Sequence, residues 1–279
     1  DHMPIQKPAP LMIGGKAHYT LSSTDPIEVE VVVPFVTDEE VGFAVASIVR
    51  QAGGEASNLQ DDAWVSEHFQ GIENGGQLME AVRLELRQSG IQGAEESKAN
   101  RCLAVLVSRL GQSVPSSDVA ETREALEAEI AQQAKEAGLS LDSFLMQQGV
   151  SRAQFEDSLD RQAQAEAEVS AALDAFASTR KLTVEDGEFE HYLSIPAKDL
   201  EPFVNQARHQ GFYDEIRDAA LRNKAMETVV AECSCSYHHE TKKETAERVK
   251  KLTDALDAVS AGQTATDATD EGPDFSKFF

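Results

Sequence analysis

Apolar residues recur along most of the chain with the spacing of helices. The first such stripe consists of Val41, Ala44, Val45, Ile48 and Val49. This i, i+3, i+4, i+7 spacing places side chains on one face of a helix. Thr37 precedes the stripe, and Glu40 follows three residues later, as in a capping box. A helix is therefore predicted to begin after Thr37 and to end at the Gly53-Gly54 pair.

The same pattern continues through the rest of the chain. A short amphipathic piece is predicted over residues 59–69. Longer helices are predicted over residues 75–110, 118–137, 152–181, 212–232 and 242–259, and shorter ones over 139–149 and 197–210. Asn74, Ser117 and Ser151 are the expected start signals, and Gly138 is an expected stop. Long helices joined by short glycine-containing turns predict a mainly α fold, an elongated multi-helix domain with two helical-hairpin arms.

Three segments favour strands. Residues 16–22 and 27–33 alternate in polarity or are β-branched, and residues 233–240 look extended. Residues 1–15 are rich in proline and glycine and are interpreted as an extended lead-in. Residues 27–33, "IEVEVVV", have no evident partner strand, so the sequence leaves open which sheet they join.

Charge and composition exclude several classes of function. The formal net charge is −24, which repels nucleic-acid backbones and anionic membranes, so neither is expected as a direct partner. No apolar run is long enough to span a bilayer. The three cysteines do not form a disulfide framework, and they favour a reducing, cytoplasmic location.

Candidate chemistry is sparse. Cys233, Cys235, His238 and His239 form a C-x-C-x-x-H-H pattern, whose residue types can bind zinc. The spacing fits no usual zinc template, so the preferred interpretation is two half-buried cysteines on a strand beside two exposed histidines. We find no motif of a hydrolase, a metalloprotease or a nucleotide-binding loop. The sequence therefore predicts no catalytic residue, no metal and no cofactor.

Apolar residues gather at the predicted turns of both arms. Around the first turn these are Leu139, Leu141, Phe144, Leu145, Met146 and Val150, and around the second they are Tyr192, Leu200, Phe203, Val204, Phe212 and Tyr213. A two-helix arm has a thin core, so part of this surface is expected to stay open for binding other polypeptides. The alternative for each residue is that it only closes its hairpin.

Read in order, several segments resemble the bacterial trigger factor, a ribosome-associated chaperone. They are residues 17–51, "DDAWVSEHFQGIENGGQLMEAVRLELRQ", "VPSSDVAETREALEAEI", residues 161–193 and residues 212–241. The resemblance runs from about His18 to about Thr245, and its strength lies in the fixed order of the pieces. It implies a SurA-like chaperone domain that binds unfolded or nascent polypeptides.

Two departures from the family pattern matter. Most members insert a prolyl-isomerase domain where this chain has only "AGGEASNLQ", so isomerase activity is not expected. The basic ribosome-docking loop of the family is also missing, and residues 27–33 resemble a connector from an absent or truncated ribosome-binding domain. Ribosome docking and homodimerisation therefore stay open.

The predicted domain organisation follows from these segments. Residues 1–36 are a linker and β segment, 37–245 a helical chaperone domain, 246–261 a terminal charged helix and 262–279 a disordered acidic tail. The predicted function is an ATP-independent holdase chaperone. The alternatives are a helical scaffold for one specific partner and an extracytoplasmic SurA-like foldase.

Overall fold

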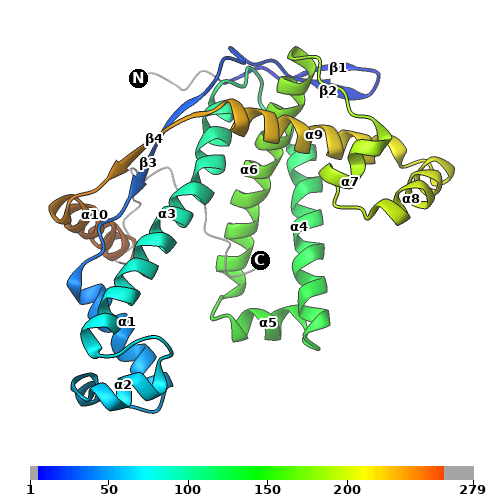
Figure 1. Cartoon of the computed structure of the whole chain (residues 1–279). Coiled ribbons are helices and arrows are strands. Elements are labelled where there is room, and N and C mark those ends of the chain that lie inside the picture. Colours follow the sequence, from blue (N-terminus) through cyan, green and yellow to red (C-terminus); the bar gives the residue numbers. More distant parts are fainter. Residues whose placement is uncertain (1–5, 261–279) are drawn as a thin grey trace. The chain divides into compact units, whose positions relative to one another are not determined.

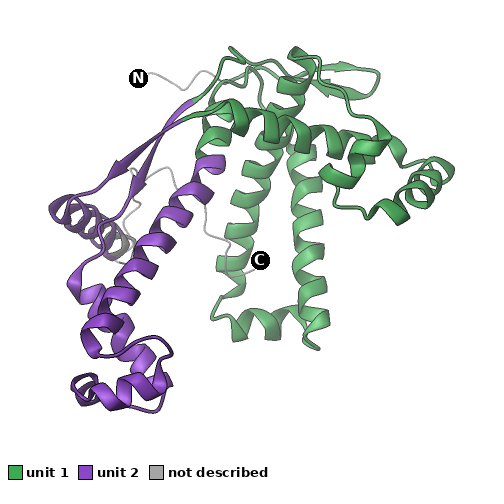
Figure 2. Cartoon of the chain, in the orientation of Figure 1, with its two compact units in different colours: residues 1–27, 101–234, 269–279 green, residues 28–100, 235–268 purple. Residues whose placement is uncertain are grey.

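The computed structural model describes residues 6–260, and helices dominate this part of the chain, which confirms the mainly α fold (Figure 1). The acidic tail predicted over residues 262–279 lies outside the described residues. The described chain divides into two compact units (Figure 2). Unit 1 contains residues 6–27 and 101–234, and unit 2 contains residues 28–100 and 235–260.

Three helices form the body of unit 2. They are α1 (Asp38–Gln51), α2 (Asp62–His68) and the first part of α3 (Gly75–Ser108). The hydroxyl of Thr37 accepts a hydrogen bond from the amide of Glu40, which confirms the predicted start of α1. The predicted stripe faces inward, and the core cluster consists of Val41, Val45, Val49, Leu78 and Val82.

Two strands from distant parts of the chain pair with each other, β3 (Glu28–Val33) and β4 (Ser234–His239). The amide of Ser234 donates to the carbonyl of Ile27, and the amide of Glu240 donates to the carbonyl of Val33. Both strands advance six residues between these bonds, so they run in the same direction. The strand predicted at residues 27–33 therefore has a partner. After β4, α10 (Lys242–Ser260) continues in unit 2.

The first arm lies in unit 1 and consists of α4 (Ser116–Glu136), α5 (Leu141–Gln147) and α6 (Arg152–Thr179). Its buried cluster contains Leu126, Ile130, Leu145, Phe155, Leu159 and Ala163. The hydroxyl of Ser151 accepts from the amide of Gln154, and the side chain of Gln154 bonds back to the amide of Ser151. This reciprocal pair is a capping box, and it confirms Ser151 as the start signal of α6.

The predicted cap at Ser117 is wrong. The residue at the N-cap of α4 is Pro115, and Ser117 is already inside the helix. Pro115 has the extended conformation that proline favours before a helix, and its carbonyl accepts from Asp118 and Val119. The helix thus starts without a side-chain cap. A search for serine or threonine caps therefore cannot locate its first residue. The expected stop is confirmed, since Gly138 follows the helix with a φ of +74°.

The second arm contains α7 (Phe189–Tyr192), α8 (Ala197–Gln210) and α9 (Tyr213–Glu232). A short 3-10 turn, η2 (Asp186–Glu188), precedes them. Phe189, Val204 and Ala220 form the buried cluster of this arm. Gly211 ends α8 in the left-handed conformation, with a φ of +80°.

Helices α6 and α9 join the two arms within unit 1, and Figure 1 shows α9 crossing α6. The C-terminal half of α6 buries Ala171, Ala172 and Ala175, and α9 buries Ala220 and Ala225. Small side chains allow two helix backbones to approach closely. The guanidinium of Arg222 on α9 also donates to both carboxylate oxygens of Asp174 on α6, at 2.7 and 3.0 Å.

The N-terminal lead-in is more ordered than the sequence predicts. Strands β1 (Leu11–Ile13) and β2 (Lys16–His18) form an antiparallel hairpin with Ile13 opposite Lys16. Gly14 and Gly15 connect them, and both have positive φ, at +59° and +79°. Two adjacent residues with positive φ are what a tight type I′ hairpin turn requires. The interpretation of residues 1–15 as an extended lead-in therefore did not include this strand pairing or the turn at Gly14 and Gly15.

Neighbouring residues on α5 offer a direct test of how the first arm is held together. Leu145 is 2% exposed, whereas Met146 is 78% exposed. We expect Leu145→Ala to lower the free energy of unfolding by about 2–5 kcal/mol, because it leaves a cavity in the arm core. Met146→Ala is the matched control and should change it by less than about 0.5 kcal/mol. Chemical denaturation followed by circular dichroism measures both, and equal losses would contradict the assigned packing.

Candidate functional site

The candidate residues of the first arm converge at the end that carries α5. Leu145 belongs to the buried cluster, and Leu141, Phe144 and Val150 pack against it while partly buried. Leu139 is also half-buried. Met146 is the member of this set with a largely exposed side chain. Most of the predicted surface therefore closes the hairpin, and Met146 remains available to a partner.

The candidate residues of the second arm are also buried or half-buried at its turn. Val204 is buried, and Tyr192, Leu200 and Tyr213 pack against the cluster around Phe189. Phe203 and Phe212 are half-buried. The structure thus brings the second set together at α7, α8 and the start of α9. Their role in binding other polypeptides stays a prediction.

Polar contacts give Tyr213 a defined structural task. Its hydroxyl donates a hydrogen bond to Asp186, and Arg208 donates to the other oxygen of the same carboxylate at 2.8 Å. The Arg208 guanidinium also lies 3.9 Å from the centre of the Tyr213 ring, in a cation–π arrangement. These contacts connect η2, α8 and α9. Tyr213 therefore holds the second arm together at its turn.

The same contacts shift two ionisation equilibria. The hydrogen bond from Tyr213, together with that from Arg208, lowers the pKa of the Asp186 carboxyl below its ordinary value. The pKa of the Tyr213 hydroxyl is raised, mainly by its hydrogen bond to the Asp186 carboxylate and to a smaller extent by burial. Both directions favour the neutral phenol and the charged carboxylate at neutral pH.

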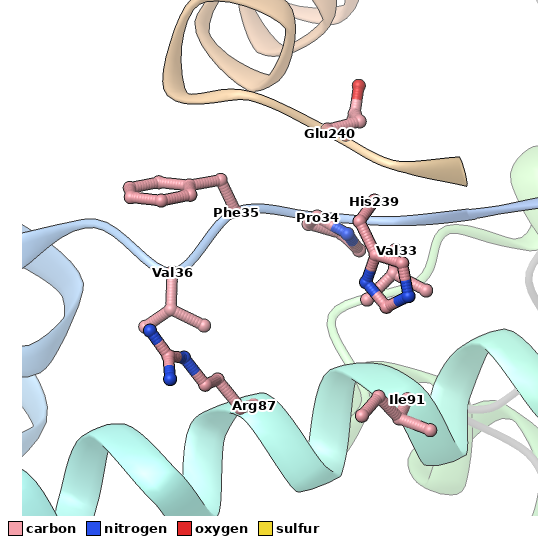
Figure 3. A pocket seen from close by; sticks show the side chains of 8 residues that line it. All are labelled: Val33, Pro34, Phe35, Val36, Arg87, Ile91, His239 and Glu240. Atoms are coloured by element: carbon pink, nitrogen blue, oxygen red, sulfur yellow. The ribbon is translucent and has the colours of Figure 1, made fainter. Parts of the chain in front are cut away.

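Unit 2 contains a cavity that the sequence does not reveal (Figure 3). Its volume is about 300 Å³, and its lining consists of Val33, Pro34, Phe35, Val36, Arg87, Ile91, His239 and Glu240. Figure 3 shows the segment 33–36 on one side and α3 on the other, with Ile91 and Arg87 on the helix. The lining is mostly apolar, and Arg87, His239 and Glu240 add a guanidinium, an imidazole and a carboxylate.

Exposed apolar side chains continue from this cavity along α3. Ile91 is 45% exposed, and Leu84 is 57% exposed. The two are seven residues apart and Arg87 lies between them, so all three share one helical face. This face differs from the one that carries the buried Leu78 and Val82. Two apolar residues, Leu84 and Ile91, on a face of α3 other than its buried one are the sequence signal that could have indicated this surface.

The C-x-C-x-x-H-H pattern does not bring its four side chains together. The Sγ atom of Cys233 lies 2.7 Å from that of Cys102 on α3. The imidazole of His238 instead pairs with Glu244 at 2.5 Å, and this contact raises the pKa of the histidine. Within residues 6–260 no group of three or more side chains is arranged to hold a metal ion.

The chain matches the model of a known protein family. The family model described as the C-terminus of the bacterial trigger factor protein matches residues 76–231, which covers most of α3 and both arms. A search of curated proteins returned no match. No helix in the described part of the chain combines the length and hydrophobicity needed to cross a membrane.

The pKa shift of Asp186 predicts a pH dependence for the second arm. A lowered pKa means that the folded chain binds this proton less tightly than the unfolded chain, so the carboxylate stabilises the fold above its ordinary pKa. The contribution is lost as the pH falls through the lowered value. We expect Asp186→Asn to reduce stability at pH 7 by less than about 1 kcal/mol, because the contact is partly exposed.

Thermal unfolding of both proteins at about pH 7 and about pH 3 measures this effect. The difference in melting temperature between wild type and Asp186→Asn should shrink at the lower pH. Glu201→Gln, at an exposed position on α8, controls for the loss of one negative charge. A difference that stays constant or grows on acidification would contradict the assignment.

Proposed function

We propose a function from one premise: the chain belongs to the bacterial trigger factor family, through the C-terminal region that forms the chaperone part of that protein. The proposal is that it acts as an ATP-independent holdase. Its partners are unfolded or nascent polypeptides, which would bind through their apolar segments and leave without chemical change. The match over residues 76–231 is the observation that carries this proposal.

The distribution of apolar side chains supports the proposal. Unit 2 offers the cavity lined by Phe35 and Ile91, which is large enough for one or a few side chains of a client. Unit 1 offers Met146 at the end of the first arm. A methionine side chain is flexible and adapts to partners of different shape. Several such weak contacts along one client would act together, because each bound segment raises the effective concentration of the next.

The strongly negative charge supports the same proposal. An unfolded client exposes apolar surface that drives aggregation, and the net charge of −24 would keep a complex with it in solution. The sequence has no phosphate-binding loop, so release would follow from weak binding rather than from nucleotide hydrolysis. We propose a cytoplasmic location, where the three cysteines would remain reduced.

The direct test is suppression of aggregation. A chemically denatured client is diluted into buffer with increasing amounts of the chain, and light scattering is recorded. We expect scattering to fall as the chain approaches equimolar amounts. No suppression at any ratio would sink the proposal, and capture of one stoichiometric partner without general client binding would indicate a scaffold instead.

Variants of this assay separate the two apolar surfaces. Leu84→Ser combined with Ile91→Ser reduces the surface of unit 2, and Met146→Ser reduces that of the first arm. Each should raise the amount of chain needed for half-maximal suppression by roughly 2- to 10-fold, because each removes apolar area that a client would bury. Val249→Ser, an exposed position on α10, is the control and should leave suppression unchanged.

A second expectation concerns catalysis. Residues 52–61, which connect α1 to α2, contain the short 3-10 helix η1 (Ala56–Gln60) where most family members insert a prolyl-isomerase domain. We expect no acceleration of cis–trans isomerisation of a proline-containing tetrapeptide over the uncatalysed reaction, whose time constant is on the order of tens of seconds. A rate that rises with the concentration of the chain would contradict this expectation.

A further inference from the structure

Two thiols from distant parts of the chain meet inside unit 1. Cys102 lies on α3, and Cys233 is the C-cap residue of α9, 131 positions later. Their Sγ atoms are 2.7 Å apart, whereas a disulfide bond is about 2.05 Å long. A small movement of either side chain would therefore bring the sulfur atoms to bonding distance. The three cysteines are present as thiols in this structure.

The two thiols differ in their access to solvent. Cys102 is fully buried, with 0% of its surface exposed, and Cys233 is half-buried. Small polar oxidants would reach Cys233 first, since reactivity follows exposure. Cys102 would then attack from the interior. An accessible thiol with a second thiol beside it is the arrangement of a redox-sensitive pair.

We propose that Cys102 and Cys233 form an intramolecular disulfide when the chain meets a peroxide. The sulfur of Cys233 attacks one oxygen of hydrogen peroxide, the O–O bond breaks, and the departing hydroxide takes up the Cys233 thiol proton and leaves as water, so that Cys233 becomes a sulfenic acid. The sulfur of Cys102 then attacks the Cys233 sulfur, the S–O bond breaks, and a second water leaves with the proton from Cys102. The peroxide is reduced by two electrons, and a thiol reductant reverses the change.

The link would act on the part of unit 1 that carries the arms. The segment between the two cysteines contains α4 to α9, so a disulfide would close a loop around both arms. Closing a long loop restricts the unfolded chain and stabilises the folded one. The oxidised chain should unfold roughly 5 °C or more above the reduced chain. A chaperone with this pair would keep its arms folded under oxidative stress.

Mass spectrometry of the whole chain tests the assignment. The chain is treated with hydrogen peroxide, remaining thiols are alkylated, and the protein is digested with trypsin without reduction. Cleavage after Arg101, Arg109, Lys224 and Lys242 yields peptides 102–109 and 225–242. We expect these two to appear joined, with the loss of two hydrogen atoms, and to separate on reduction.

Peptide 225–242 also contains Cys235, so variants must identify the partner. Cys235→Ser should form the joined peptides as fast as wild type, and Cys233→Ser should lose at least 90% of them. Cys102→Ala should instead accumulate sulfenic acid at Cys233, which a dimedone label detects without requiring a stable disulfide. Equal linkage in Cys233→Ser, a bond between Cys233 and Cys235, disulfide-linked dimers or an unlinked Cys235→Ser chain would each overturn the proposal.

Discussion

The close packing of α6 against α9 is the constraint on which unit 1 depends. Each arm contributes one of these helices, so both arms diverge from a single helix–helix contact. Both helices bury alanines, including Ala172 and Ala225, and small side chains allow helix backbones to approach closely. The bidentate pair between Arg222 and Asp174 fixes the orientation at the same contact. A larger side chain at either buried alanine would overpack the interior around it.

A thin helical arm has few apolar residues left to expose for binding a client. A hairpin of two helices has few side chains to bury, and the cluster of the first arm uses most of the apolar residues near its turn. Residues that could bind a client are thus also the residues that keep the arm folded. Met146 is an exception: its side chain is exposed and can contact a client, because the neighbouring Leu145 packs in the arm core instead. In unit 2, α3 divides the two tasks between its faces: the face with Leu78 is buried in the core, and the face with Ile91 is exposed.

The sequence was a good guide where structure is local and a poor one where it is not. Apolar stripes and caps such as Ser151 predicted most helices, because these signals lie within one helix. The pairing of β3 with β4 was missed because the strands are far apart along the chain. The contact between Cys102 and Cys233 and the cavity beside Ile91 were missed for the same reason. Candidate residues at the arm turns were located, but periodicity alone could not tell closing residues from exposed ones.

Ionic and thiol contacts hold the C-terminal end of α9 in different ways. Arg180, just after α6, donates to the Glu232 carboxylate at 2.9 Å, and this pair lowers the pKa of Glu232. Both side chains are about one-third exposed, so salt weakens the contact. Cys233 is the next residue, and its sulfur atom contacts that of Cys102, which is buried on α3. Oxidation would therefore add a covalent attachment of α9 to α3 beside this salt-sensitive ion pair, at the point where α9 ends and the chain enters β4.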